Sequence, residues 1–381
     1  MRVLFQPCKL GNLELPNRIV RSATYDGMAY KTGHVSARQI DLYDSLAAGG
    51  VGLIITGITY VHPSGQISSF QNSIANDDYI DGFKKLTQAV HERGAKIAVQ
   101  LFHAGREAHR FLKPKKMSAS APSFIEQDAY FKGEYEPFAE DQIWEIVTSF
   151  GDAARRAREA GFDGVQIHGA HAYLLSQFLS PYTNKRRDKW GGPLENRIRF
   201  HHEILRDIKK KAGADYPILL KLGVQDGFRE GLRFAEGKLA ALNLARAGFD
   251  ALEISQGLRG RWYSETEFRT HIRTPHDEAY FRNWCKEIKS SLTIPVPLIL
   301  VGGLRSPDII EEILLKHEAD LISLCRPLIR EPGIINAWKS GSNEKSQCIS
   351  CNKCLEKVLK GKPLACEQVE GGGVKGRGSG A

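Results

Sequence analysis

The sequence of 381 residues lacks several features that would define other classes of protein. It has no apolar run long enough to cross a bilayer, and its first residues, M-R-V-L-F-Q-P, have no extended apolar region like that of a secretory signal. No G-x-G-x-x-G motif opens a helical segment, which argues against a doubly wound dinucleotide-binding sheet. We therefore expect a cytoplasmic protein without a membrane span.

Cysteine is scarce over most of the chain and crowded near its end. Four of the seven cysteines, Cys348, Cys351, Cys354 and Cys366, form the pattern C-x2-C-x2-C-x11-C. This density is typical of soft-metal ligation and not of a disulfide framework. It predicts a [4Fe–4S] cluster, with a zinc site or free thiols as alternatives.

The net charge of +9 is spread along the chain. The densest basic run, K-K-K at 209–211, ends an amphipathic helical pattern, where cations are favourable. K-P-K-K at 113–116 lies in a loop and is a weaker hint of attraction for an anionic substrate. We expect no nucleic-acid partner from this dispersed distribution.

Short apolar runs alternate with amphipathic helical patterns along the chain. The helical patterns include Ile80–Glu92, Ile143–Ala160, Arg197–Lys211 and Pro307–Lys316. The apolar runs lie near residues 18–22, 51–56, 96–102, 163–167, 217–222, 250–255, 297–301 and 320–324. Eight such repeats predict the α/β class and a closed parallel (β/α)8 barrel, although a doubly wound sheet is the alternative architecture.

Three segments are predicted outside this repeat. Gly11-Asn12 indicates a hairpin turn before the first strand, and the insert from about 104 to 140, rich in Pro, Ser and aromatics, is expected to cap the barrel mouth. The predicted boundaries are a barrel over 1–340, a cysteine-rich extension over 341–370 and a glycine-rich, disordered tail over 371–381.

Three polar rings follow the apolar run Asp163–Ile167, namely His168, His171 and Tyr173. In parallel α/β folds, the carboxyl ends of the strands hold the ligand. These rings are therefore placed to bind an anionic oxygen and to deliver a proton. Metal ligation by the His-x-x-His pair, or a purely structural loop, are the alternative interpretations.

The stretch from 163 to 199 resembles the central motif of the Old Yellow Enzyme family of FMN-dependent oxidoreductases. It matches H-x-A-H-x-Y-L-x-x-x-F-L-S-P followed by N-x-R-x-D-x-x-G-G-x-x-x-N-R, and L-F-Q-P-C-K-L-G-N-L-E-L-P-N-R-I-V resembles the family's N-terminus. The resemblance implies reduction of activated C=C bonds in enone, enoate or enoyl-type substrates. It assigns oxygen binding to His168 and His171 and proton donation to Tyr173.

The resemblance also implies which residues contact the flavin ring. Ala23, Thr24 and Tyr25 occupy the positions beside its N5 and O4 edge, and Tyr25 departs from the thiol or smaller side chain common there. Gln100, in Q-L-F-H-A-G-R, suits the pyrimidine edge, although a strand glutamine can also be a core hydrogen-bonder. Lys221 matches the cation near N1 and O2.

Two charged residues stand in apolar strands, where burial is costly without a partner. Lys221 has Asp226 and Glu230 nearby in sequence, and either is a candidate for an ion pair. Glu253, in A-L-E-I-S, has no partner that the sequence identifies.

A phosphate site is predicted after the last two strands. Gly302 and Gly303 precede a helix opened by Ser306-Pro307, and backbone N–H groups at such a turn bind anions. Cys325 offers an amide and Arg326 a guanidinium that can bind phosphate bidentately. Both motifs resemble the FMN phosphate site of the family.

The placement of the four cysteines is similar to that in trimethylamine dehydrogenase and 2,4-dienoyl-CoA reductase, which hold a [4Fe–4S] cluster and continue into FAD- and pyridine-nucleotide-binding domains. Because this sequence ends soon after the cysteines, we expect an external electron-donor protein, or NAD(P)H acting directly if no cluster is present. The remaining alternatives are an electron-transfer module, an amine dehydrogenase and a metal-dependent barrel hydrolase. The family resemblance also implies a homo-oligomer.

Overall fold

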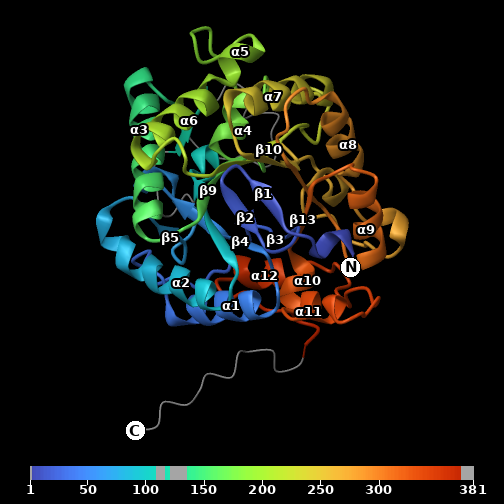
Figure 1. Cartoon of the computed structure of the whole chain (residues 1–381). Coiled ribbons are helices and arrows are strands. Elements are labelled where there is room, and N and C mark those ends of the chain that lie inside the picture. Colours follow the sequence, from blue (N-terminus) through green and yellow to red (C-terminus); the bar gives the residue numbers. More distant parts are fainter. Residues whose placement is uncertain (1, 109–115, 121–134, 370–381) are drawn as a thin grey trace.

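Eight parallel strands close into a ring in the computed structural model, which describes residues 2–108, 116–120 and 135–369 (Figure 1). Each strand pairs with its neighbours, and the last strand returns to the first through Ser323 opposite Val20. The strands are β3 (Ile19–Arg21), β4 (Leu53–Tyr60), β6 (Lys96–Phe102), β9 (Gly164–Gly169), β10 (Ile218–Gly223), β11 (Ala251–Ser255), β12 (Leu298–Val301) and β13 (Leu321–Leu324). All eight predicted runs are these strands, so the predicted barrel is confirmed.

Helices surround the ring, as Figure 1 shows. They are α1 (Ala37–Ala48), α2 (Ile80–Glu92), α3 (Glu140–Glu159), α4 (Leu174–Leu179), α5 (Leu194–Arg197), α6 (Arg199–Ala212), α7 (Phe234–Ala247), α8 (Arg282–Ser291), α9 (Pro307–Leu315), α10 (Arg326–Arg330), α11 (Ile334–Lys339) and α12 (Lys353–Leu359). Among residues 2–108, 116–120 and 135–369, no helix combines the length and apolarity that a bilayer span requires.

The helix predicted over 197–211 is wrong in one respect, because the chain breaks at Ile198 between α5 and α6. The buried guanidinium of Arg197 binds the carbonyls of Leu179 and Gly192 and the carboxylate of Glu236. These long-range contacts fix the direction of the chain at this point. No local sequence pattern could reveal them.

A hairpin closes the amino-terminal end of the barrel. Strands β1 (Cys8–Leu10) and β2 (Leu13–Leu15) pair antiparallel around Gly11, whose φ of +54° lies in the left-handed region, as the turn prediction required. Leu10 and Leu15 pack into the same apolar cluster as Leu219 and Ile299 of the barrel interior. The hairpin lies over the centre of the ring in Figure 1, which leaves the carboxyl ends of the strands as the open side.

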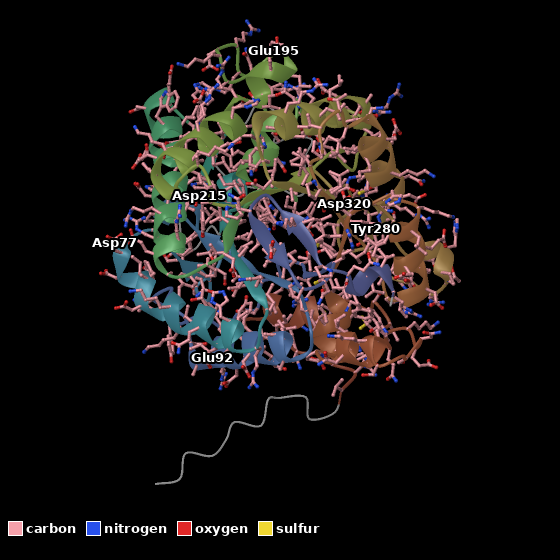
Figure 2. The ribbon with its side chains drawn as sticks, viewed as in Figure 1. Asp77, Glu92, Glu195, Asp215, Tyr280 and Asp320 are labelled. Carbon is pink, nitrogen blue, oxygen red and sulfur yellow. The ribbon has the colours of Figure 1, made fainter. Side chains whose placement is uncertain are left out.

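Side chains fill both the interior of the ring and the layer between strands and helices (Figure 2). In that layer, His201 of α6 is fully buried, and neither ring nitrogen has a hydrogen-bond partner among the described residues. Burial lowers the pKa of His201 to about 3. Between about pH 6.5 and pH 3, the His201 ring is therefore neutral in the folded protein and protonated in an unfolded chain.

His201→Leu should flatten the acid dependence of stability. The unfolded chain binds a proton at His201 below about pH 6.5 and the folded protein does not, so stability falls with pH until the folded pKa is reached. Between pH 7 and 5 the variant should lose about 2 kcal/mol less of its free energy of unfolding than the unmodified protein. Denaturant melts at both pH values measure this, and parallel losses would contradict the assignment.

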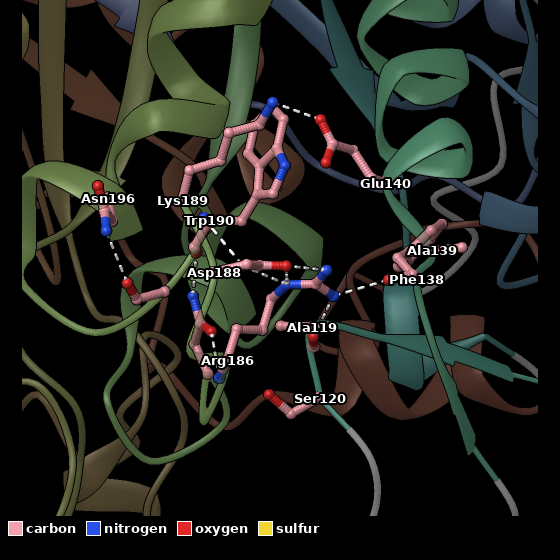
Figure 3. A network of polar contacts seen from close by, with 12 residues as sticks. Ala119, Ser120, Phe138, Ala139, Glu140, Arg186, Asp188, Lys189, Trp190 and Asn196 are labelled. Carbon is pink, nitrogen blue, oxygen red and sulfur yellow. Dashed lines mark hydrogen bonds and ion pairs between the residues drawn. The ribbon is translucent and has the colours of Figure 1, made fainter.

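Within the insert predicted to cap the mouth, the structure describes residues 104–108, 116–120 and 135–140, and the short parallel strands β7 (Lys116–Ser118) and β8 (Tyr135–Pro137) pair there. Residues 109–115 and 121–134 lie outside the described residues, as do most of the K-P-K-K run and the tail at 371–381. Arg186 anchors both ends, because its Nη1 donates to the carbonyls of Ala119 (3.1 Å) and Phe138 (2.6 Å) (Figure 3). Asp188 holds the Arg186 guanidinium at 2.6 Å.

The cysteine-rich extension packs on the open end of the barrel. Arg305, after β12, binds it twice, because its carbonyl accepts from Ser346 N–H (3.0 Å) and its Nη1 donates to the Cys348 carbonyl (2.8 Å). Farther along, Leu364 N–H donates to the Asp26 carbonyl at 2.9 Å. The extension thereby forms part of the wall around the mouth.

Candidate functional site

One cavity at the open end gathers the barrel residues that the sequence predicts as functional. Its empty volume is about 1250 Å³, including the open mouth. Its lining includes Ala23, Thr24, Tyr25, Gln100, His168, His171, Tyr173, Lys221, Gly302, Gly303, Cys325 and Arg326. Asn352 and Cys354 of the extension line the same cavity.

A continuous polar chain crosses the cavity floor. Gln100 Nε2 donates to Gln166 Oε1, and Gln166 Nε2 donates to Glu253 Oε2, each at 2.7 Å. Lys221 Nζ lies 3.2 Å from Glu253 Oε1, and Lys221 and Glu253 also share the Ser22 hydroxyl at 3.0 Å. Because Lys221 and Glu253 are almost fully buried, each offsets the desolvation of the other. Gln100 has the role of core hydrogen-bonder while also facing the cavity.

The predicted partners of Lys221 are therefore wrong. Lys221 stands directly opposite Glu253 in the parallel register of β10 and β11. Asp226 instead accepts from the Ser180 hydroxyl and the Leu258 N–H, both at 2.6 Å. Neighbours across a sheet come from distant sequence positions, so proximity along the chain was a misleading guide.

His168 lies inside β9 and not beyond its end as predicted, because the strand continues to Gly169. Burial, together with the nearby His171 and Lys221, holds the pKa of His168 well below its usual range, so the ring is neutral. Its Nδ1 accepts from the Ala170 N–H at 3.3 Å. The proton of the neutral ring therefore resides on Nε2, which makes that nitrogen a hydrogen-bond donor.

His171 follows in a left-handed backbone conformation with φ of 60°, as does Ala172 with φ of 67°. This unusual turn places the His171 ring 4.9 Å from the His168 ring. His171 Nε2 is bonded to the Ser255 hydroxyl at 2.8 Å, and burial also lowers the His171 pKa. Left-handed backbone at two successive non-glycine residues is costly and is characteristic of functional sites.

Tyr173 is partly buried and lies between an aromatic ring and a cation. Phe102 meets it edge-on at 4.5 Å, and the Arg259 guanidinium lies 5.4 Å from the Tyr173 ring centre. Burial raises the pKa of Tyr173, and Arg259 opposes that rise. Glu267 holds Arg259 at 2.6 Å and lies 3.8 Å from His171 Nδ1.

The sequence did not identify Arg259 and Glu267 as site residues. Both lie on the long connection after β11, where the sequence has no hydrophobic period, and only their position after a barrel strand could have drawn attention to them. Lys221 and Arg259 both lower the pKa of His168 and His171, while Glu267 opposes them at His168, so the two cations add a positive contribution at the histidine pair. This contribution suits an anionic oxygen and disfavours the metal cation of the hydrolase alternative.

The glycine turn after β12 is shaped by Tyr280. Gly302 and Gly303 have φ of +123° and +74°, and a Cβ on either would lie less than 3.0 Å from the Tyr280 ring. Only glycine therefore fits at both positions. The Tyr280 hydroxyl donates to the Glu267 carbonyl at 2.6 Å, which fixes the ring against the turn.

The start of α9 does not have the predicted role in binding an anion from solution. The Glu278 carboxylate already accepts from the N–H groups of Arg305 (2.8 Å) and Ser306 (2.9 Å). It also accepts from the Ser306 hydroxyl at 2.7 Å. The glycine turn and Arg326 are the predicted phosphate contacts that these bonds leave available, and Arg326 Nη1 donates to the Arg269 carbonyl (2.8 Å).

The predicted flavin-edge residues line the side of the cavity next to β3. The Tyr25 hydroxyl donates to Ser68 Oγ at 2.6 Å, and burial raises the pKa of Tyr25 to about 12. Thr24 Oγ1 lies 3.1 Å from Cys325 Sγ, which joins this edge to the start of α10. Tyr25 therefore presents a neutral ring at a position where the family commonly has a smaller side chain.

The four clustered cysteines line one second, smaller pocket beside the cavity, together with Arg326 and Asn352. All seven cysteines are free thiols. Within the part of the chain that is described, no set of three or more His, Cys, Asp or Glu side chains is arranged to hold a metal ion. The thiols thus converge on a shared pocket without forming a ready single-ion site.

A parallel barrel, closed at one end and lined with cations and polar rings at the other, is the architecture of a cofactor-binding barrel enzyme. The chain belongs to the NADH:flavin oxidoreductase / NADH oxidase family, which it matches over residues 3–345. The predicted resemblance is thereby confirmed.

Particular relatives agree with this membership. The chain is 38% identical to NADH oxidase of Thermoanaerobacter brockii over 92% of its own length and 52% of the relative's. It is 31% identical to cinnamate reductase of Clostridium sporogenes over 96% of its own length and 57% of the relative's. A 2-naphthoyl-CoA reductase complex aligns with a TM-score of 0.87 at 27% identity, covering 96% of this chain and 56% of that one. The chain spans about half the length of these relatives.

Proposed function

We propose that this protein is an FMN-dependent reductase of activated C=C bonds, with an enoate or a related carboxylic acid derivative as its substrate class. The observation that supports this most strongly is the meeting of His168, His171 and Tyr173 in one cavity with Lys221 and Arg326. Relatives named for cinnamate and 2-naphthoyl-CoA reduction support the substrate class.

The cavity fits a large polar cofactor. Ser323 Oγ is buried on its wall and, among the described residues, has no hydrogen-bond partner. Buried polar atoms of this kind indicate a missing ligand. Gln100 and Lys221 would hold the flavin ring, with Ala23, Thr24 and Tyr25 along its edge. Gly302, Gly303, Cys325 and Arg326 would hold its phosphate.

The bound flavin would supply a hydride from N5. His168 Nε2–H donates a hydrogen bond to the substrate oxygen, and His171 binds beside it, so that the alkene is polarised. Tyr173 delivers the proton to the α carbon. Arg259 lies over the Tyr173 ring and is itself held by Glu267, so it helps to fix the position of that ring.

The cysteine pocket is proposed to hold a [4Fe–4S] cluster, with zinc as the alternative. Cys354 lines both this pocket and the main cavity, which favours electron exchange between them. An external protein or NAD(P)H would supply the electrons. We further propose that the protein lies in the cytoplasm, because clustered cysteines without disulfides are typical of a reducing compartment. The proposed homo-oligomer follows from the family resemblance. The proposed domains are a barrel over 1–340 and an extension over 341–370.

The decisive functional experiment is anaerobic. The FMN-loaded protein is reduced and mixed with cinnamate or cinnamaldehyde, flavin absorbance is followed, and the product is identified by mass spectrometry. We expect reoxidation in step with formation of the saturated product, with one deuterium at the β carbon when the flavin carries deuteride. Reoxidation by oxygen or quinones only would refute alkene reduction and would favour the electron-transfer alternative.

A further inference from the structure

One residue of the extension reaches from the cysteine pocket into the cofactor cavity. Asn352 lies between Cys351 and Cys354, is only 5% exposed, and adopts the left-handed conformation with φ of 58° and ψ of 10°. Asparagine tolerates this conformation better than most residues do. Asn352 lines both pockets, so its side chain stands at the boundary between them.

The carboxamide of Asn352 joins two elements of the barrel mouth. Its Oδ1 accepts from Arg326 Nη1 at 2.6 Å, and its Nδ2 donates to the Phe268 carbonyl at 2.5 Å. Arg326 Nη1 also donates to the Arg269 carbonyl at 2.8 Å. The same contacts thus tie the predicted phosphate arginine to the connection that carries Glu267.

We propose that Asn352 is a positioning residue that couples the cysteine pocket to the phosphate end of the cofactor cavity. The inference rests on the proposed FMN site. Arg326 Nη1 is held by two acceptors, so the Nη2 and Nε groups remain as donors for a phosphate, and the ordered side chain loses little freedom when phosphate binds. Without the carboxamide, the Arg326 side chain becomes ordered only when the cofactor binds, and the entropy lost in that step lowers the affinity for FMN.

The position of Asn352 in the chain provides the coupling. Cys351 and Cys354 flank it, so a metal group bound by these thiols fixes the backbone from which the carboxamide projects. Loss of that group frees this backbone and loosens the contact with Arg326. FMN retention should therefore depend on the state of the cysteine pocket, although no cysteine need contact the phosphate.

The test compares FMN with riboflavin, which lacks the phosphate. Asn352→Gly removes the carboxamide and keeps a residue suited to the left-handed backbone. In flavin-stripped protein titrated by fluorescence, we expect Asn352→Gly to weaken FMN binding about 10- to 100-fold, as loss of a hydrogen bond to a charged group implies. Riboflavin binding should be unchanged.

The exposed neighbour Lys353 provides the control, since Lys353→Gln alters the same segment without touching Arg326 and should leave both affinities within about twofold. In the unmodified protein, chelation of the metal or Cys351→Ser should also weaken FMN selectively, with no further loss in Asn352→Gly. Equal weakening of FMN and riboflavin, or no weakening, would overturn the inference. An unmodified protein that binds neither flavin would instead overturn the proposed function.

Discussion

Tyr173→Phe slows reoxidation of the reduced protein by an enoate or enone about 10²- to 10⁴-fold, the range that a positioned proton donor contributes. Reduction of the flavin is spared, because the substitution removes only a hydroxyl from a ring that stays packed against Phe102. Anaerobic stopped-flow spectroscopy separates the two half-reactions. The retained ring and the preserved edge contact also keep the change in stability small.

Tyr79→Phe makes the same chemical change away from the cavity, where the tyrosine hydroxyl bonds the Thr32 carbonyl at the surface, and it should change neither half-reaction. Quinone acceptors provide a second comparison, since they take electrons without requiring a proton on carbon. If Tyr173→Phe slowed reoxidation by alkenes and by quinones equally, or slowed neither reaction, Tyr173 would not be the proton donor.

Lys221→Met should destabilise the protein by about 3–5 kcal/mol, because it leaves Glu253 buried without its cation. It should also slow flavin reduction, since the fixed cation that stabilises negative charge on the ring is lost. Denaturant melts and reductive stopped-flow traces measure the two effects on the same sample.

The double variant Lys221→Met/Glu253→Gln separates these effects. Removing the carboxylate relieves the unpaired charge, so most of the stability should return, while flavin reduction should remain slow. If the stability and the rate of flavin reduction both recovered, Lys221 would serve only as the ion-pair partner of Glu253. If neither the stability nor the rate of flavin reduction recovered, the ion-pair interpretation would be contradicted, because the two residues would then show no energetic coupling.

The barrel could be predicted because its eight strands are short apolar runs separated by helical patterns, and local periodicity is sufficient to identify such elements. The cavity residues were predictable for a related reason, since the carboxyl ends of parallel strands meet at one edge of the barrel. Gln100, His168 and Lys221 come from three different strands of that edge.

The features that were missed depend on partners distant in the chain. The pairing of Lys221 with Glu253 follows from sheet register, and the use of Glu278 at the start of α9 follows from packing of a loop. Arg259 lies on an irregular connection whose course no periodicity reveals. Polar contacts across the fold, unlike the strands themselves, leave no local signature in sequence.

Whether this barrel carries FMN is tested most directly by the visible spectrum of anaerobically purified protein, with its released flavin and iron quantified. We predict structured yellow flavin bands, with FMN released on denaturation, over a broad brown absorbance accompanied by iron and sulfide. Flavin bands without iron would leave the reductase proposal intact and remove the cluster. A colourless protein that takes up no added FMN would show that the barrel is not an FMN site.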